Sequence, residues 1–508
     1  MRRTSVFHPF LFALFPILSA FVHNSSQMQL SELWLPLSVV LAGTSLLWIL
    51  LRMGIEDRAK VGLLLSGLIF FFFSYGHVIG LIHGARLGGW MWGRHRYVLL
   101  VFGLLLVSHV FLCLRTRRNL ETLTRFLNTF SLCLVGISLI TGLAQFGGRI
   151  QNSEGPDPSG MALKAPAAKP DIYYLILDGY GRQDVLQNLY DYDNSEFLGF
   201  LKQKGFYIAS QSYTNYPQTH LSLSSSLNFE YLDELARRMG PRNSDRSPLV
   251  KRMRDNRIMQ LLKSQGYRTL SFDTLVKADV HLSYKGTVTE FQNVLLNTTP
   301  VPYLMERLRL PFSRFQYDAH RNQMRFILEK LPELPQEDGP IFVFAHVLLP
   351  HPPFVLGAQG EALSVDRKFH LYDGSHFFEL GGTRKEYLEG YRNQVRYVNS
   401  KVNTAVERIL QESVRPVVLI IQGDHGPGMY LDHSSLEKTH LAERMAILNA
   451  YYLPGAEARL YPRISPVNSF RVLLNHVFGA DLELLPDRSH FAPHTYPYDL
   501  TEVTDQLR

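Results

Sequence analysis

The sequence predicts a membrane protein of two parts: a five-helix transmembrane domain, followed by an α/β domain with a central, mostly parallel sheet. Three observations support this fold class. The first 150 residues contain five long apolar runs, each near the ~20 residues that cross a bilayer as a helix. Residues 151–508 alternate short apolar runs with amphipathic segments, as strands covered by helices on both faces do. The charge balance changes between the two parts.

The excess of positive charge is confined to the first part. The chain has 508 residues, a formal net charge of +7 and a pI near 9.1. Residues 1–150 carry 13 Lys and Arg against 4 Asp and Glu, whereas residues 151–508 carry 39 against 41. A nucleic-acid-binding protein needs its positive charge on a folded polar surface, so we expect no nucleic-acid partner. The 46% content of apolar residues excludes a disordered chain.

The predicted transmembrane domain covers residues 1–146. Its apolar runs lie at 6–23, 33–51, 61–82, 97–114 and 126–146. The run at 61–82 contains four consecutive phenylalanines and no charge, and a buried helix of a soluble protein is rarely so uniformly apolar. The run at 6–23 also resembles a signal peptide, but it lacks a clear cleavage site and four more spans follow it.

The short loops predict the orientation of these spans. One side carries nine positive side chains and the other three. The nine are Arg2, Arg3, Arg52, Arg58, Lys60, Arg115, Arg117, Arg118 and Arg125; the three are Arg86, Arg94 and Arg96. The positive-inside rule then places the N-terminus in the cytoplasm. Because five is odd, we expect a multi-pass protein of the inner (cytoplasmic) membrane whose second domain lies on the extracytoplasmic, periplasmic side.

Three histidines, His77, His83 and His109, lie in or beside the later predicted spans. An ionisable group inside a membrane is a candidate for function by default. The simpler interpretation is that all three are neutral, and either face the interface or form hydrogen bonds between helices. The spans show no paired carboxylates or broken repeats of the kind that line a transport path. The sequence therefore predicts an anchor rather than a transporter.

Residues 147–170 are rich in Gly, Pro and Ala and predict a linker to an outer domain at 171–508. Expected strands occupy 172–178, 267–272, 341–349, 417–424 and 446–454, and expected helices occupy 194–204, 256–265, 317–331 and 384–412. Fully apolar strands that alternate with helices predict a sheet covered on both faces.

The chemistry is expected where the strands end, because ligands of such sheets bind outside the carboxyl ends of the strands. Asp178 ends the first strand, Asp424 and His425 end the fourth, and His351 follows the third. Carboxylate and imidazole together suit Zn²⁺ or Mn²⁺. Alternatives remain for single residues: Asp178 beside Gly179 is also a common turn residue, and His351 in its Pro-rich context could be an ordinary loop histidine.

A hydroxyl-rich segment at 212–232 supplies candidate nucleophiles. Thr219 follows Pro217-Gln218 and precedes an apolar-periodic run, so it is expected to open a helix. Backbone N–H groups and the helix dipole favour an anion such as phosphate there. An N-cap role for Thr219 explains the same position and does not conflict with a nucleophilic one. Ser222 competes as the nucleophile, but three residues further along it should turn away from the strand ends.

In this order, Asp178, Thr219, His351 and the Asp424-His425-Gly426 motif resemble the alkaline phosphatase/sulfatase superfamily. The likeness is closer to its branch of lipoteichoic acid synthases and lipid A phosphoethanolamine transferases, which also join five spans to an outer catalytic domain. The segment 391–402 resembles the long helix that precedes the last metal-binding strand of that family. The resemblance implies an alkaline phosphatase/sulfatase-like fold for residues 171–508.

The resemblance also implies roles for single residues. Asp178, Thr219, Asp424 and His425 would bind the divalent metal ion, with Thr219 as nucleophile, and His351 would contact the substrate phosphate. His433 and Arg444 are weaker candidates on the substrate side. The implied reaction moves a phosphoglycerol or phosphoethanolamine head group from a phospholipid donor to an envelope glycan or lipid acceptor through a phospho-Thr intermediate.

The sequence also departs from relatives. Formylglycine sulfatases need Cys or Ser in a C/S-x-P-x-R context, and the stretch after Pro217-Gln218 has neither that Pro nor that Arg. The only cysteines, Cys113 and Cys133, lie in apolar runs, so the outer domain has none of the disulfides of the lipid A transferases. Two alternatives stay open: a phosphodiesterase or sulfuric ester hydrolase of the same fold, and a non-catalytic envelope scaffold.

Overall fold

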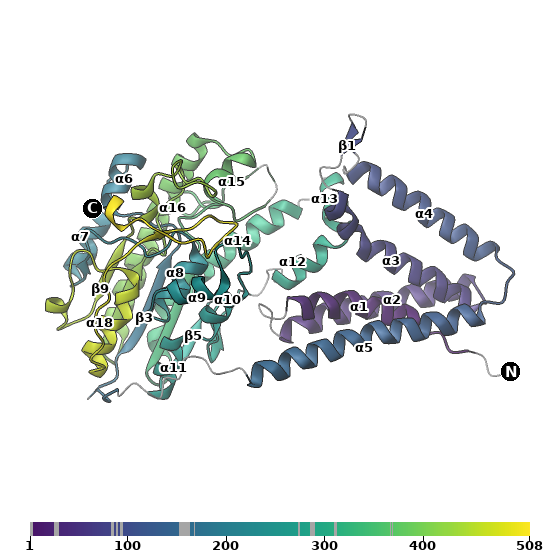
Figure 1. The fold of residues 1–508 in the computed structure, drawn as a ribbon, viewed down its shortest axis with the longest axis horizontal. Helices are drawn as coiled ribbons and strands as arrows, with labels where there is room; N and C mark the ends of the chain where they lie inside the picture. The colour runs from purple at the N-terminus through teal and green to yellow at the C-terminus, as the bar shows by residue number, and fades with distance from the viewer. Residues whose placement is uncertain are drawn as a thin grey trace. The chain divides into compact units, whose positions relative to one another are not determined.

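The computed structural model describes residues 4–24, 30–82, 86–87, 90–91, 95–151, 163–166, 168–272, 275–284, 290–308, 312–365, 367 and 369–507. Most of the predicted linker, at 152–162 and 167, lies outside this set. The chain divides into two compact units (Figure 1). The membrane unit comprises residues 1–153 and 288–312, and the outer unit comprises residues 154–287 and 313–508.

The membrane unit contains the apolar helices that the sequence predicts. They are α1 (His8–His23), α2 (Trp34–Gly54), α3 (Arg58–Ile82), α4 (His95–Arg115) and α5 (Glu121–Gln151). Among the described residues, α2, α3, α4 and residues 121–144 of α5 are long and apolar enough to cross a membrane. Helix α1 is apolar but has only 16 residues. Five crossings therefore stay a prediction, whereas the N-terminal apolar helices are confirmed.

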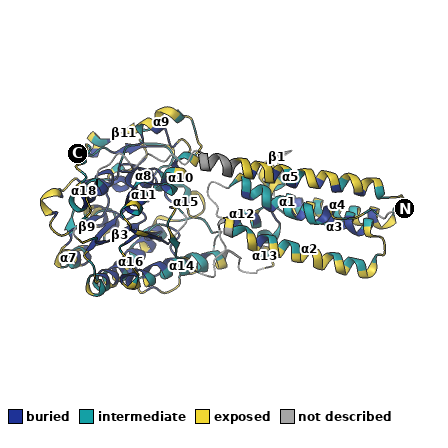
Figure 2. Ribbon diagram, turned by 90° about the horizontal axis from the view of Figure 1, so that it is seen from below, coloured by how far each residue is buried: buried dark blue, intermediate teal, exposed yellow. Residues whose placement is uncertain are grey.

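The outward faces of α2 and α4 are apolar, whereas the exposed face of a helix in a soluble protein is usually polar. Leu46 on α2 is 58% exposed and Leu104 on α4 is 60% exposed, and Figure 2 shows the exposed surface along α2. A continuous apolar surface of this kind is unfavourable in water and suits a hydrocarbon environment. These helices therefore satisfy their backbone internally and present side chains to lipid.

Two short helices from the middle of the chain belong to the membrane unit. These are α12 (Glu290–Asn297) and α13 (Val301–Arg307). Phe291 packs edge-on against Phe21 of α1 at 5.6 Å between ring centroids, and Tyr303 stacks on His95 of α4 at 4.5 Å. The sequence analysis assigned all of 171–508 to one outer domain. These helices are amphipathic and of ordinary length, so their sequence alone does not separate them from the rest.

The outer unit is built on a sheet of seven strands in the order β4-β9-β8-β3-β7-β5-β6. The strands are β3 (Asp171–Leu177), β4 (Tyr207–Ile208), β5 (Arg268–Ser271), β6 (Val280–His281), β7 (Ile341–Val347), β8 (Val417–Gln422) and β9 (Asn449–Tyr452). Pairs β8-β3, β3-β7, β7-β5 and β5-β6 are parallel, while β9 and β4 add an antiparallel edge. The predicted mostly parallel sheet is confirmed.

Both faces of the sheet are covered by helices, as the continuous apolar strands predict. Alternate residues of β3 enter two separate cores: Tyr173, Leu175 and Leu177 join one, and Ile172, Tyr174 and Ile176 join the other. Helices α6 (Gln183–Tyr190), α7 (Ser195–Gln203), α14 (Phe312–Lys330) and α16 (Arg384–Glu412) pack on the first face. Helices α8 (Thr219–Ser226), α10 (Ser247–Arg254), α11 (Arg257–Ser264) and α18 (Pro466–Phe478) pack on the second.

The strand register brings three carboxyl ends to one edge of the sheet. Leu177 of β3 lies opposite Val347 of β7, and Ile176 lies opposite Gln422 of β8. At the other end of β3, the fully buried Asp171 accepts hydrogen bonds from Ile341 N (3.0 Å) and Arg415 Nε (2.8 Å). One carboxylate therefore ties the starts of β3 and β7 to the segment entering β8.

Removing this carboxylate should destabilise the outer unit. We expect Asp171→Ala to lower its free energy of unfolding by about 3 kcal/mol, because Arg415 and the Ile341 amide lose their shared acceptor. Urea unfolding of the full chain in detergent measures the effect. The matched control is Asp338→Ala, which removes an exposed carboxylate and should change little. Equal stability of the two variants would contradict this role for Asp171.

Candidate metal centre and active site

Asp178 directly follows β3, and Asp424 lies two residues after the end of the neighbouring strand β8. Each carboxylate uses only one of its two oxygens for hydrogen bonds within the protein. Asp178 Oδ2 lies 3.1 Å from His346 Nε2. Asp424 Oδ1 accepts from Gly179 N at 3.1 Å and from His425 N at 2.9 Å. The other oxygens, Asp178 Oδ1 and Asp424 Oδ2, are buried and accept no hydrogen bond among the described residues. Buried carboxylate oxygens without partners are costly, so this geometry calls for a cation.

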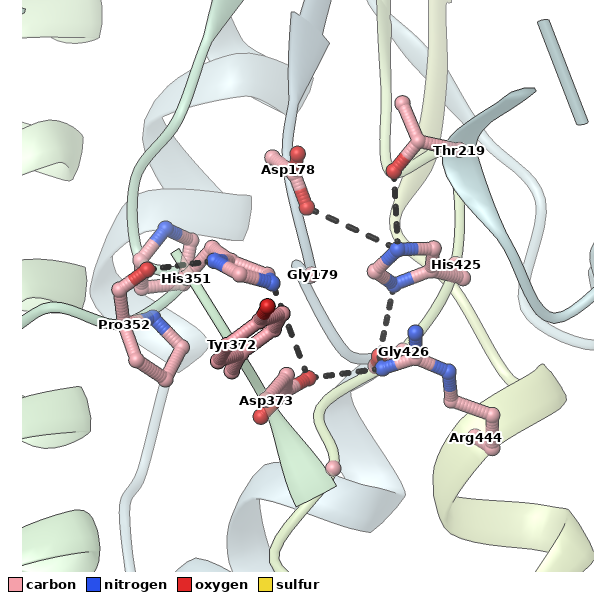
Figure 3. Close-up of polar contacts among 12 residues, drawn as sticks. Asp178, Gly179, Thr219, His351, Pro352, Tyr372, Asp373, His425, Gly426 and Arg444 are labelled. Atoms are coloured by element: carbon pink, nitrogen blue, oxygen red, sulfur yellow. Dashed lines mark hydrogen bonds and ion pairs between the residues drawn. The ribbon is translucent and has the colours of Figure 1, made fainter. Parts of the chain in front are cut away.

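The two free oxygens lie close to His425 and Thr219, and Figure 3 shows Asp178 and Thr219 on either side of the His425 ring. From His425 Nε2 the distances are 3.4 Å to Asp424 Oδ2, 3.6 Å to Asp178 Oδ1 and 3.2 Å to Thr219 Oγ1. Ligands that bind one ion tetrahedrally at about 2.0–2.1 Å lie about 3.3 Å apart. Asp178, Asp424 and His425 offer ligand atoms that all lie within 4.8 Å of one another. The donor set therefore fits a small divalent metal ion.

Thr219 reaches this point because α8 begins there. Gln218 is extended and Thr219 is the first residue of the helix. Its hydroxyl shares the site with the free backbone N–H groups of the first turn, which favour a bound anion. Ser222 is buried and donates to the carbonyl of Asp424 at 2.7 Å. Ser222 thus fixes the metal-binding loop, and Thr219 presents its hydroxyl to the site.

Two glycines let the loops close around the carboxylates. Gly179 has a φ of +73°, which a residue with a side chain rarely adopts, and its N–H donates to Asp424. At Gly426 a Cβ would lie 2.0 Å from the carbonyl oxygen of Glu443. The third residue of the Asp-His-Gly motif is therefore glycine because the backbone at Gly426 packs directly against the backbone at Glu443.

The ionisation of Asp178 depends on the imidazoles around it. Burial opposes its negative charge, but His351 and the hydrogen bond from His346 outweigh burial, and the pKa of Asp178 lies far below its usual range. Burial, with Arg444 next in importance, lowers the pKa of His425. Asp178 is therefore an anion and His425 a neutral imidazole near pH 7, which are the protonation states of metal ligands.

His351 lies next to the centre and faces a second carboxylate. Its Nε2 is 3.9 Å from Asp373 Oδ2, and its ring centroid is 6.2 Å from that of His425. Asp373 is buried and accepts from Tyr387 OH at 2.6 Å and from Arg444 Nη1 at 2.8 Å. Burial would raise its pKa, but His351 and Arg444 lower the pKa of Asp373 to about 2. His351 is thus held beside the strand ends, and its contact with a substrate phosphate stays a prediction.

Arg444 is buried inside the loops around the site. Besides Asp373 it donates to the carbonyls of Pro217 (2.8 Å) and Gly426 (3.0 Å). These bonds connect the start of α8, the metal-binding loop and the Asp373 loop. Its contacts suit a residue that positions the site, and a direct substrate contact stays a prediction.

His433 belongs to a group of three imidazoles at the Asp373 side. Its ring stacks on His376 at 4.3 Å between centroids and meets His494 at 5.1 Å, and its Nε2 lies 2.9 Å from Asp373 O. Burial lowers the pKa of His433 to about 3 and that of His494 to about 4. At neutral pH these two rings are uncharged hydrogen-bonding groups.

Side chains of helix α16 form hydrogen bonds to three of the loops around the site. Tyr391 OH donates to Gly179 O at 2.9 Å, after β3. Tyr387 OH accepts from Gly428 N at 2.9 Å, after β8. Gln394 Nε2 donates to His351 O at 3.1 Å, after β7. These positions are four and three residues apart and therefore share one helix face.

The sequence analysis did not find His346, Asp373, His376 and His494. His346 had a usable signal, since it is the only polar residue within the otherwise apolar strand β7. Asp373 had none, because it precedes the short helix α15 (Gly374–Glu379) in a segment without regular pattern. His376 and His494 are far apart in sequence, and only the tertiary fold brings their rings together.

Comparison with known proteins gives the family. The sulfatase family model matches residues 170–462, more than half of the chain. The chain thus joins a domain that matches this model to apolar N-terminal helices. The chain belongs to the sulfatase family. No curated protein matches the sequence.

Solved structures give weaker likenesses. The zinc complex of the periplasmic domain of EptC from Escherichia coli shares 11% identity at a TM-score of 0.43, covering 67% of this chain and 95% of that one. The phosphoethanolamine transferase EptA from Neisseria meningitidis shares 14% at 0.39, covering 92% and 95%. An alkaline phosphatase superfamily protein from Vibrio parahaemolyticus shares 13% at 0.38, covering 67% and 79%.

Metal binding should depend on Asp178 and Asp424, each of which has one carboxylate oxygen without a hydrogen bond among the described residues. We expect Asp424→Ala to reduce bound Zn²⁺ or Mn²⁺ from about one ion per chain to a small fraction, because affinity falls when a charged ligand is removed. Inductively coupled plasma mass spectrometry of the dialysed protein measures the content. Asp193→Ala, an exposed carboxylate, is the matched control. Unchanged metal content in Asp424→Ala would overturn the assignment.

Because the carboxyl group of Glu443 is buried, we expect the stability of the loops around the site to depend on pH. It accepts from Tyr430 N at 2.8 Å and from Tyr190 OH, and burial raises its pKa to about 8. The folded state thus holds a proton that the unfolded chain releases near pH 4.5. This contribution to the free energy of unfolding is complete below about pH 4.5 and is lost as the pH rises through about 8.

Glu443→Gln should remove this dependence, because glutamine mimics the protonated carboxyl and keeps both partners. Relative to the variant, the wild type should lose up to about 1.4 kcal/mol per pH unit between pH 5 and 8. Thermal unfolding of the full chain at pH 5, 7 and 9 measures this. The two melting temperatures should agree at pH 5 and diverge at pH 9. A constant difference would show that Glu443 does not titrate in this range.

Proposed function

We propose that this protein is a membrane-anchored, metal-dependent phosphotransferase that moves a phosphoglycerol or phosphoethanolamine head group from a phospholipid to an envelope glycan or lipid. The observation that carries the proposal is the Thr219 hydroxyl, which opens α8 and lies 3.2 Å from His425 Nε2 beside two carboxylate oxygens without partners. A hydroxyl so placed suits covalent catalysis on a phosphodiester. Family membership and the apolar helices agree with the membrane setting.

The proposed reaction has two transfer steps. Thr219 Oγ1 forms a bond to phosphorus, the bond to the diacylglycerol oxygen breaks, and diacylglycerol leaves with a proton. In the second step an acceptor hydroxyl bonds to phosphorus, the Thr219 ester breaks, and Thr219 regains a proton. His351 and the first N–H groups of α8 face the phosphoryl oxygens and stabilise their charge. Asp178, Asp424, His425 and Thr219 would hold a divalent ion, whose Lewis acidity would lower the pKa of the Thr219 hydroxyl.

The donor set favours Zn²⁺ over Mn²⁺ in this proposal. The 3.2–3.6 Å separations from His425 Nε2 match tetrahedral ligands, and one imidazole with oxygen ligands is within the range of zinc sites.

The orientation of the protein in the membrane is part of the same proposal. The excess of positive loops on one side places the N-terminus in the cytoplasm and the active site on the periplasmic side.

Hydrolysis is the second candidate, and the match to the sulfatase family favours it. The same Thr219 ester would then be resolved by water instead of an acceptor hydroxyl. Incubation with labelled phosphatidylglycerol and phosphatidylethanolamine separates the two reactions. Transfer requires an added glycan or lipid acceptor, whereas hydrolysis releases the head-group phosphate without one.

The nucleophile can be tested by substitution. We expect Thr219→Ala to lower head-group turnover by about 10³-fold or more, and Thr219→Ser to retain part of it, because only the hydroxyl reacts. Tandem mass spectrometry of the wild type, trapped without acceptor, should place the added mass on Thr219. Ser222→Ala is the control and should keep the adduct. Full turnover by Thr219→Ala, or an adduct on Ser222, would contradict the proposal.

A further inference from the structure

The membrane unit contains a large cavity of ≈ 1140 Å³ between its helices. It is lined by residues of α1, α3, α4, α5 and α12. The volume is slightly above the ~300–1,000 Å³ usual for small-molecule sites. No residue of α2 or α13 is among those that line it. The cavity is therefore a feature of the helix packing around α1.

The lining is apolar along most of its length. Phe12, Phe15, Phe71, Phe130 and Leu134 contribute to it, and the described lining residues include no Asp, Glu, Lys or Arg. The polar groups at one end are already used within the protein. His109 Nε2 lies 3.1 Å from Leu63 O, and Ser66 Oγ lies 2.7 Å from His8 Nδ1. This end offers a hydrocarbon surface and no polar anchor.

The length of the lining matches a lipid chain. On α3 it extends from Leu63 to His77, and those 14 steps at 1.5 Å per residue give about 21 Å. Half of the ~30 Å hydrocarbon core is about 15 Å. The cavity therefore has room for a chain that reaches from the polar boundary to the middle of a bilayer.

The opposite end of the cavity is polar. His23 and Asn24 at the end of α1, His77 of α3 and Thr298 after α12 meet there. Ser74 Oγ also lines this end, is buried, and has no hydrogen-bond partner among the described residues. Imidazole, amide and hydroxyl groups are hydrogen-bond donors suited to a phosphate. The cavity thus has an apolar body and one hydrogen-bonding end, like a phospholipid.

Helix α12 completes the polar end. Gly76 N donates to Thr298 O at 2.8 Å, and a Cβ at Gly76 would lie 2.1 Å from Asn297 O. Ile17 and Phe21 of α1 pack with Phe291 and Leu295 of α12 in one buried cluster. The end of the cavity is therefore formed by a segment that comes from the middle of the chain, and close packing on α3 holds it there.

We propose that the membrane unit binds one glycerophospholipid in this cavity. A hydrocarbon chain lies between α1, α3 and α5, and the phosphate is bound at the end formed by His23, Ser74 and His77. The apolar lining, the length along α3 and the single polar end together favour this occupant. The site is independent of the proposed reaction, because none of its residues belongs to the outer unit.

Photo-crosslinking in reconstituted vesicles tests the proposal. The probe is phosphatidylglycerol with a diazirine in one acyl chain, at low abundance in vesicles of phosphatidylglycerol and phosphatidylethanolamine. The protein is the full chain with Thr219→Ala, so that turnover does not affect the result. We expect labels on lining peptides of α1, α3 and α5. Ser19→Phe with Ser74→Phe places two bulky rings inside the cavity and should reduce these labels by roughly tenfold, or about 1.4 kcal/mol of binding.

The control is Ser45→Phe, which adds the same bulk to an exposed position of α2 and should leave labelling unchanged. Native mass spectrometry of the wild type should show one retained phospholipid per chain. Labels spread evenly over α2 and α4, labelling insensitive to the two added rings, or a retained isoprenoid instead of a glycerophospholipid would each overturn the proposal. A folding defect is distinguished by circular dichroism, and Gly76→Leu then provides a second variant that displaces α12 and should also lose the labels.

Discussion

Two buried carboxylates at the ends of adjacent parallel strands are the constraint on which the candidate site depends. Asp178 and Asp424 each give one oxygen to the protein and leave one without a partner. Two such negative charges repel each other in a low-dielectric interior unless a positive charge lies between them. The order β8-β3-β7 puts both carboxylates, with His425 and His346, at the same edge. The arrangement is thus stable as a cation site, and the Thr219 hydroxyl is close enough to share the ion.

The rest of the outer unit keeps this edge rigid. Asp171 ties the opposite ends of the same strands together. Tyr387, Tyr391 and Gln394 on one face of α16 bind the three loops that carry the candidate site, and Arg444 connects the start of α8 to the loop of Gly426. A site that must hold reacting groups to fractions of an ångström requires such support. The side chains proposed to react are few, whereas the side chains that position them come from many segments.

The sequence predicts most of the fold because the signals are local. Continuous apolar runs identify the strands and the membrane helices, and Asp178, Asp424 and His425 follow from the rule that ligands bind at strand ends. The structure groups 288–312 with the membrane helices, and the sequence gives no sign of it, because what distinguishes that segment is its packing against Phe21 and Gly76. Asp373 and the stacked rings of His376, His433 and His494 likewise arise from contacts between distant segments. The choice of Thr219 over Ser222 rests on helix geometry, and it agrees with the bond from Ser222 to Asp424 O.

The central claim is that one imidazole and three oxygen atoms, one of them from Thr219, bind a single divalent ion. X-ray absorption spectroscopy of the zinc-loaded full chain tests it most directly. The account predicts a four-coordinate first shell with one nitrogen from His425, at about 2.0–2.1 Å, and a change in the oxygen shell when Thr219 is replaced by Ala. A first shell with two or more imidazoles, or a spectrum identical in Thr219→Ala, would contradict it.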